Sequence, residues 1–235
     1  MATYPTDTHA GQGGRGGSRT VAGWHQSLPG RWVHHVLSAL KGLPFLRRPE
    51  GRIFFIADLH FNHARIIHYC RRPYRSLAEM NRDLVRRWNS IVGPLDIVYC
   101  LGDFCMRGDP GHWIQSLAGR KVFIRGNHDS HLPGMRHHSV LSYRGRTFYL
   151  THDPADVPGS WEGWVIHGHT HNNSMDIYPF INGGRRTINV SCECTGYAPV
   201  SLDFLLSLPL ESVTRMETIA SVPQKKISSP PARYF

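Results

Sequence analysis

The chain has 235 residues, 40% of them apolar and 19% charged, which suits one globular domain with terminal segments and excludes a wholly disordered protein. Its net charge of +10 lies partly in the termini, because residues 1–50 carry six Lys or Arg against two acidic residues, and residues 211–235 carry four against two. The charge therefore gives little support to a single basic face for nucleic acid.

The five cysteines are an odd number, and the sequence from Met1 to Pro5 lacks the charged and apolar regions of a secretory signal. No stretch approaches the length of a membrane span. We therefore expect free thiols and a cytoplasmic location. Cys192 and Cys194 are predicted to share one face of a strand as a structural pair, because no second Cys/His pair at zinc spacing accompanies them.

The N-terminal segment differs in composition from the rest. Residues 1–30 are rich in Gly, Ser, Thr and Pro and are predicted to be disordered. Residues 31–46 carry apolar side chains at helical spacing between basic ones, as in a helix that either lies on a membrane surface or packs on its own domain. The sequence thus predicts an extension over 1–50, a folded domain over 51–210 and a tail over 211–235.

The predicted domain alternates short apolar strands with helices, which fits an α/β class. A capping box at Ser76–Glu79 precedes an amphipathic stripe, and Asp109-Pro110 begins another helix. In chain order, the sequence predicts a strand at 53–56, helices at 63–71 and 77–92, a strand at 97–101, a helix at 110–118, a strand at 121–125, a hairpin of 140–143 and 146–150, strands at 164–167 and 187–193, and a helix at 202–208.

Polar side chains follow the predicted strands at the point where each strand ends. The carboxyl ends of strands are where ligands bind in open α/β sheets. Each residue alone fits an ordinary turn or a buried polar group, but five apolar strands that all end in Asp, Asn or His would be a rare coincidence. The residues at these ends are Asp58, His60, Asp103, Asn127, His128, His152, His169 and His171.

Carboxylate, amide and imidazole groups without thiolates indicate a centre for Mn²⁺, Fe, Zn²⁺ or Ni²⁺ and disfavour a structural zinc site. The set holds too many ligands for one ion. Hydrolases with two metal ions hold them about 3.5–4 Å apart and use them to clamp an in-line displacement. We therefore expect two divalent ions as cofactors, with Mn²⁺ as the first choice.

The motifs resemble those of calcineurin-like metallophosphoesterases, in particular a branch of small prokaryotic phosphoesterases. The resemblance covers residues 53–171 and implies a four-layer α/β/β/α sandwich with a dimetal site at the sheet edges. The matching motifs are Asp58-Leu-His60, Gly102-Asp103, Gly126-Asn-His-Asp129, His152 and Gly168-His-Thr-His171. Similar flanking stretches are Asp58-Leu-His-Phe-Asn-His63, Trp88-Asn-Ser, Asp96-Ile-Val-Tyr, Ile188-Asn-Val-Ser and Pro199-Val-Ser-Leu202.

The resemblance also implies roles for single residues. His128 is expected to be a catalytic group that protonates the leaving group, and Asp129 beside it is a candidate to orient its ring. Asn62 stands where similar sequences often have Gly, which could alter the loop beside the first metal. The implied half-sites are Asp58, His60 and His171 for one ion and Asn127, His152 and His169 for the other, with Asp103 as the bridge.

The implied reaction is hydrolysis of a phosphate ester by metal-activated hydroxide, without a covalent intermediate, because no Cys or Ser has the setting of a nucleophile. A small-molecule phosphodiesterase or phosphatase is the first expectation. A metal-dependent nuclease is the alternative, and a binding scaffold without catalysis is disfavoured because no ligand is missing. Arginines that could either hold a nucleic-acid backbone or solvate helix faces are Arg65, Arg71, Arg72, Arg75, Arg86 and Arg87.

Overall fold

The computed structural model describes residues 51–129 and 134–221. All of these residues belong to one unit of the chain, which begins at Arg48. The predicted disorder of 1–30 and the predicted helix of 31–46 lie outside the described residues. Within the described part, no helix combines the length and apolarity that crossing a membrane requires.

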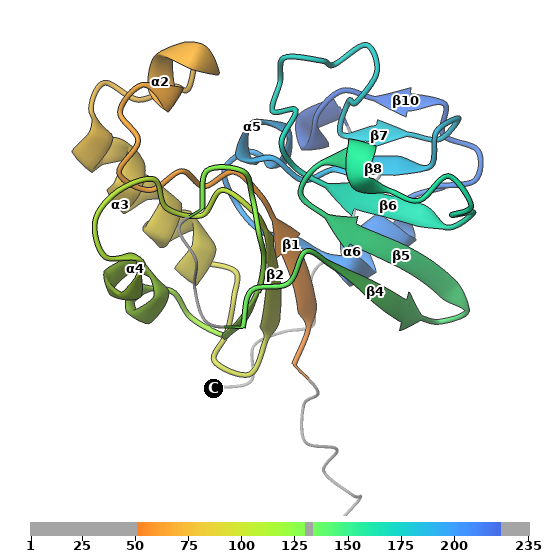
Figure 1. Cartoon of the computed structure of the whole chain (residues 1–235), viewed down its shortest axis with the longest axis horizontal. Coiled ribbons are helices and arrows are strands. Elements are labelled where there is room, and N and C mark those ends of the chain that lie inside the picture. The colour runs from red at the N-terminus through yellow and green to blue at the C-terminus, as the bar shows by residue number, and fades with distance from the viewer. Residues whose placement is uncertain (1–50, 130–133, 222–235) are drawn as a thin grey trace, which may run out of the picture. The chain divides into compact units, whose positions relative to one another are not determined.

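The first sheet has four strands, and three of them match predicted strands. The strands are β1 (Ile53–Ile56), β2 (Ile97–Leu101), β3 (Arg120–Ile124) and β9 (Val200–Ser201), in the order β3-β2-β1-β9. β1, β2 and β3 are parallel, and β9 is antiparallel to β1. Because parallel strands end at the same edge of a sheet, the loops after β1, β2 and β3 come together there (Figure 1).

The second sheet has six strands and contains the predicted hairpin around Arg144-Gly145. The strands are β4 (His138–Tyr143), β5 (Arg146–Thr151), β6 (Trp164–His167), β7 (Ile181–Asn182), β8 (Thr187–Asn189) and β10 (Arg215–Met216), in the order β10-β7-β8-β6-β5-β4. β5, β6 and β8 are parallel neighbours, so their carboxyl ends also share one edge.

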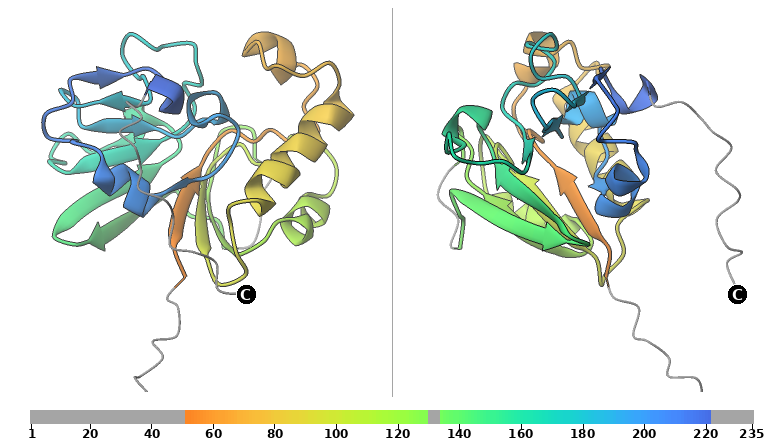
Figure 2. Two further views of the ribbon diagram at one scale, coloured as in Figure 1. Left: turned by 180° about the vertical axis from the view of Figure 1, so that it is seen from behind. Right: turned by 90° about the vertical axis from the view of Figure 1, so that its right-hand side faces the viewer.

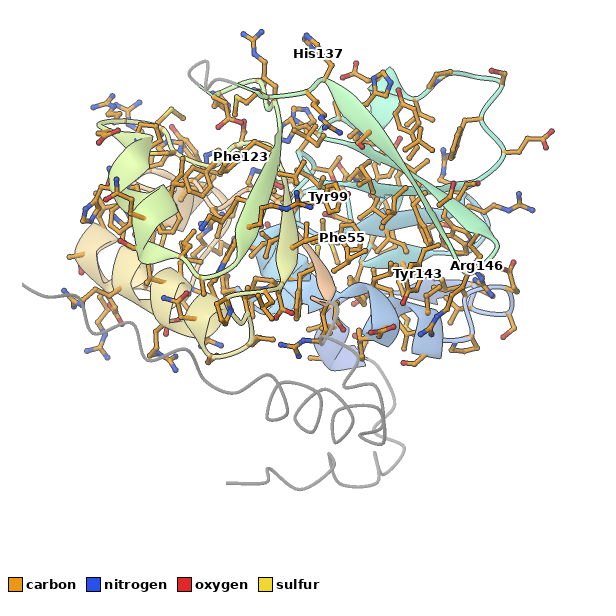
Figure 3. The ribbon with its side chains drawn as sticks, turned by 90° about the horizontal axis from the view of Figure 1, so that it is seen from below. Phe55, Tyr99, Phe123, His137, Tyr143 and Arg146 are labelled. Atoms are coloured by element: carbon orange, nitrogen blue, oxygen red, sulfur yellow. The ribbon has the colours of Figure 1, made fainter. Side chains whose placement is uncertain are left out.

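Two apolar cores hold the layers together. Between the sheets, Phe55 and Leu101 pack with Phe148 and Ile166. Phe55 also stacks on Tyr99, and Figure 3 shows both rings on the side of the first sheet that faces the second. On the other side of the first sheet, helices cover β1 and β2 (Figure 2). The helices are α2 (Ile66–Tyr69), α3 (Leu77–Asn89) and α4 (Pro110–Ser116).

The outer face of the second sheet is covered differently. Tyr149 contacts the Trp161 ring, and the ring of His167 lies edge-on to Tyr178. Within the described residues, the segments that cover this face are loops with one 3-10 turn, η2 (Pro154–Asp156). The mixed α/β sandwich of two sheets is confirmed, with helices over one sheet and loops over the other.

The prediction of a strand over 187–193 is wrong beyond Asn189. The side chain of Asn189 accepts hydrogen bonds from the backbone N and the hydroxyl of Ser191, which turns the chain out of the strand. Cys192 and Cys194 therefore lie in helix α5 (Cys192–Thr195), where they enter opposite apolar cores and share no strand face. All five cysteines are free and buried.

The C-terminal part of the fold extends beyond residue 210. β10 pairs with β7 and Met216 is buried, so residues 211–221, predicted as tail, belong to the second sheet and its edge. A strand of two residues gives no periodic pattern by which it could be predicted. Ser201 caps helix α6 (Leu202–Ser207) as predicted, through a hydrogen bond from the backbone N of Phe204.

Candidate metal centre

The loops that follow β1, β2, β3, β5 and β6 bring all seven predicted ligands into one cluster. Three of them, Asp58, His60 and His171, are buried and can converge on one ion. The Nε2 atoms of His60 and His171 are 3.4 Å apart, and His171 Nε2 is 3.7 Å from Asp58 Oδ1. Two imidazole nitrogens and a carboxylate oxygen that face one another in this way suit a shared cation.

Asp103 connects this group to a second one. Its Oδ2 atom is 3.4 Å from His60 Nε2 and 3.6 Å from His152 Nε2. Its other oxygen accepts a hydrogen bond of 2.9 Å from the backbone N of His128. One carboxylate oxygen thus lies between imidazoles of both groups, which is the position that a bridging ligand requires.

The second group is built around His152. Its Nδ1–H donates to Leu101 O at 2.8 Å, which directs Nε2 toward the cluster. This nitrogen faces Asn127 Oδ1 at 2.9 Å and His169 Nδ1 at 3.3 Å. His169 Nε2 points toward Asp153 at 3.6 Å. One nitrogen of His152, one nitrogen of His169 and the amide oxygen of Asn127 therefore converge, and these residues fit a second cation.

A buried ionic network supports the first group, and the sequence did not reveal it. Both oxygens of Glu193 lie within 3.3 Å of His171 Nδ1, and Glu193 also pairs with Arg72 at 2.8 Å. Arg72 donates further to the carbonyl oxygens of Asp58 and Leu59. Carboxylates that hold the far nitrogen of a ligand histidine orient its ring and raise its basicity. Arg72 and Glu193 are 121 residues apart, so no local pattern joins them.

The pKa shifts within the cluster show that its carboxylates attract positive charge. Burial opposes the charged form of His171, yet the carboxylates of Asp58 and Glu193 raise its pKa to about 11. Burial lowers the pKa of His60, helped by His171 beside it. Burial also raises the pKa of Asp103, against the attraction of His152. Without metal, a proton on His171 balances the charge of these carboxylates. Bound divalent cations would balance it in place of the proton.

Five of the ligand residues have backbones in the left-handed region. Their φ angles are 57° for Asp58, 51° for His60, 52° for Asp103, 68° for His169 and 47° for His171. Residues with a Cβ atom pay roughly 1–2 kcal/mol for this conformation. Such strain gathers at functional sites, where surrounding structure holds it in place.

Two neighbouring positions explain how the loops fit. Asn62 also has a positive φ, of 63°, which Asn tolerates better than most residues, so the loop can hold this conformation without a glycine. Its side chain donates to Arg107 O and accepts from Asn81 Nδ2. Gly168 must lack a side chain, because a Cβ atom there would lie 2.7 Å from Asp58 Oδ2. The motif residues therefore position the ligands as well as supplying them.

The structure gives Asp129 another role than the expected one. Its carboxylate accepts hydrogen bonds of 2.8 Å from the backbone N of Asp103, Phe104 and Gly126. Within the described residues, no hydrogen bond joins it to the ring of His128, so it holds two ligand loops together and does not orient that ring. His128 itself is exposed, with its ring 5.8 Å from that of His60.

A cavity of about 330 Å³ opens beside the cluster. Its walls include His60, Asp103, His128 and, at its outer side, Arg65 and Tyr69. A second cavity of about 260 Å³ adjoins the other group and is lined by side chains that include Arg125, His137 and Asp156. Asn127 and His169 line both cavities, so the cluster is open on two sides.

Three of the six candidate arginines for nucleic acid are engaged elsewhere. Arg72 is buried in its pair with Glu193, and Arg86 and Arg87 both pair with Asp83. Arg72 is therefore removed from the proposed basic surface, whereas the side chains of Arg86 and Arg87 stay 67% and 42% exposed and share one carboxylate. Arg65 remains exposed beside the cluster.

Known proteins similar to the chain include one archaeal and one viral relative. The chain is 45% identical over 162 residues to the uncharacterized protein MJ1445 of Methanocaldococcus jannaschii, a match that covers 67% of this chain and 90% of that protein. It is 35% identical over 85 residues to the gene 66 protein of Mycobacterium phage L5, covering 34% and 41%. The crystal structure of AQ665 from Aquifex aeolicus, a protein of unknown function, is similar with a TM-score of 0.51 and 21% identity, covering 67% and 98%. The last likeness shows a shared fold.

The sequence profile of calcineurin-like phosphoesterases matches residues 51–196. This range is more than half of the chain and contains every residue of the cluster, together with Arg72 and Glu193. The resemblance inferred from the motifs is confirmed, and divalent metal ions are the cofactors of such phosphoesterases. The chain belongs to the calcineurin-like phosphoesterase family.

Proposed function

We propose that this protein hydrolyses phosphate esters of small molecules with two divalent ions bound at the cluster. The observation that carries the proposal is the position of Asp103 Oδ2 between His60 Nε2 and His152 Nε2. A single structural ion would need no such bridge. When bound, the two ions lower the pKa of water and neutralise charge on the phosphoryl oxygens.

The protein residues supply the remaining steps. We assign His128 as the general acid, because it lines the cavity beside the ligands and is exposed enough to meet a substrate. Its backbone N–H is tied to Asp103 Oδ1, so its position is fixed relative to the bridge. Asp129 fixes the same loop through three backbone hydrogen bonds. His128 would give its proton to the leaving oxygen, which an alkyl ester requires.

The size of the site favours a small substrate. Cavities of about 330 Å³ and 260 Å³ lie at or below the lower end of the range for small-molecule pockets. A phosphodiester and a phosphomonoester both remain compatible with them. A nuclease is the second candidate, because Arg65 and Arg125 are exposed on opposite sides of the cluster and could hold flanking phosphates.

The metal and the compartment are part of the same proposal. Carboxylate, amide and imidazole ligands suit Mn²⁺, with Fe, Zn²⁺ or Ni²⁺ as the alternatives. The five free cysteines are in the state that a reducing cytoplasm maintains, which supports a cytoplasmic location.

A substrate panel tests the proposal. The metal-free protein is reconstituted with Mn²⁺, Fe²⁺, Zn²⁺ or Ni²⁺ and assayed on mono- and diester model substrates, cyclic nucleotides and single- and double-stranded nucleic acid. We expect turnover on at least one small ester that depends on two bound ions. Cleavage of nucleic acid alone would favour the nuclease, and no turnover with two ions bound would refute hydrolysis.

A further inference from the structure

A separate cavity of about 800 Å³ lies on the outer face of the second sheet. Its floor is formed by Val165 of β6 and Thr187 of β8, which are paired in register. It exists because this face is covered by loops and not by packed helices. None of its lining residues lines either of the cavities beside the metal cluster. The active centre therefore does not account for it.

One end of this outer cavity is cationic. Arg185 and Arg186, in the turn between β7 and β8, both line it, against one acidic residue, Glu162. Arg186 is braced by a hydrogen bond from its Nη1 to the backbone oxygen of Glu162. Among the residues that the structure describes, none accepts a hydrogen bond from the guanidinium of Arg185. Two arginines that line the same cavity, one of them with its guanidinium group held in place, suit the oxygens of a phosphate.

The floor carries a polar group without a partner. Thr187 is 6% exposed, and no described group forms a hydrogen bond with its hydroxyl oxygen. The oxygen is itself shielded from solvent, so a ligand in the cavity does not reach this hydroxyl.

The remaining walls are aromatic and apolar. Trp161 and Tyr178 both line the cavity, together with Pro154 and Val157. Gly163 allows the Trp161 ring its place, because a Cβ atom at 163 would lie 2.7 Å from that ring. The Trp161 Nε1–H donates to Trp164 O at 3.3 Å, which fixes the ring plane. An indole ring held in place beside two arginines suits a flat ring system that carries an anion.

We propose that the outer cavity is a second binding site, distinct from the metal centre, for a small organic phosphate that contains a flat ring, of the size of a mononucleotide. The phosphate contacts Arg185 and Arg186, and the ring packs against Trp161 or Tyr178. The volume is within the range of pockets for ligands of this size.

Calorimetric titration of the whole Mn²⁺-loaded chain tests this site. The probe is the phosphonate analogue of adenosine 5′-monophosphate in which methylene replaces the ester oxygen, so it cannot be hydrolysed. We expect Arg185→Ala/Arg186→Ala to weaken binding in one component of the isotherm at least tenfold, since two charge-assisted bonds are lost. Turnover on nitrophenyl phosphate should stay within about twofold, because neither arginine touches the metal cluster.

Three further variants test whether the probe binds in the outer cavity. The double variant Arg82→Ala/Arg120→Ala removes the same charge from the other side of the fold and should bind as the wild type does. Thr187→Val, of the same shape, should leave binding of the probe unchanged, because the hydroxyl oxygen is shielded from the cavity. Trp161→Leu should weaken the probe by about 2- to 10-fold and leave inorganic phosphate unaffected. Wild-type binding by Arg185→Ala/Arg186→Ala, or an equal loss in the charge control, would overturn the site.

Discussion

The two halves of the metal cluster are built in different ways. Asp58, His60 and His171 are buried, and behind His171 lies the buried pair of Glu193 and Arg72. In the other half, Asn127 is exposed, and the side chains of His169 and its partner Asp153 are 38% and 35% exposed. Low dielectric strengthens every interaction in the first half, while solvent weakens those in the second. We therefore expect one firmly held ion and one that exchanges readily.

Removing the bridge should have the largest effect, because both halves share it. Asp103→Asn takes away the anionic oxygen that lies between His60 Nε2 and His152 Nε2. We expect loss of at least one ion and of nearly all turnover, measured by metal analysis of the purified variant and by ester hydrolysis. Two retained ions with normal turnover would refute the bridging assignment.

His128 belongs to neither half, so its removal should leave both ions bound. His128→Ala should lower turnover on an alkyl phosphate ester by about 10²–10⁴-fold, the usual value of general acid catalysis. A nitrophenyl ester should be impaired much less, because nitrophenolate leaves without a proton. Equal losses on both esters, or loss of an ion, would make His128 a ligand or an oxyanion stabiliser.

The buried pair of Glu193 and Arg72 should also make the folding stability depend on pH in the acid range. Burial disfavours the Glu193 carboxylate, but Arg72 overrides it and lowers its pKa from 4.5 to about 2. Because the folded pKa is depressed, this stabilisation is complete above pH 4.5 and is lost as the pH falls toward 2. The shift corresponds to about 3 kcal/mol. Urea unfolding of the metal-free protein at pH 5 and pH 3 should therefore show a smaller pH dependence in Glu193→Gln than in the wild type.

Metal affinity should also differ between the two halves when each loses its supporting carboxylate. Glu193→Gln should weaken binding of the firmly held ion by about 10- to 100-fold, as loss of a ligand's supporting carboxylate does. Asp153→Asn, the matched change in the exposed half, should cost only a few-fold because its contact with His169 is long and partly solvated. Competition with a chelator measures both affinities. Similar losses in the two variants would remove the proposed asymmetry.

The smallest effect is expected from the N-terminal segment, which supplies no ligand to either half. Deletion of residues 1–30 should leave turnover on a small model ester unchanged. A truncated protein that folds normally, as judged by circular dichroism, but loses activity would show that the extension takes part in the site.

The strand ends could be predicted because each couples an apolar run to a polar turn within a few residues. The ligand set at Asp58, Asp103 and His152 follows from that local pattern. The support behind the ligands could not be predicted in this way, since Arg72 and Glu193 meet only in the folded chain. The strand predicted over 187–193 failed beyond Asn189 for the same reason.

Asn189 illustrates that failure. Its amide donates to the backbone oxygens of His171 and Tyr178 and to the Thr170 hydroxyl. Contacts with a distant loop thus fix its side chain, which then turns the chain at Ser191. The residues around it favour a strand, and the tertiary contacts override that preference.

The left-handed backbones of the ligand residues have a consequence for how this sequence can change over time. Glycine adopts such φ angles without a Cβ clash. A glycine in place of His60 or His169 would therefore relieve the backbone strain of its loop. Selection for folding stability alone would therefore lead these positions away from Asp and His. Asp and His at these positions lower the folding stability. They are retained for the chemistry of the site, as expected where activity and stability compete.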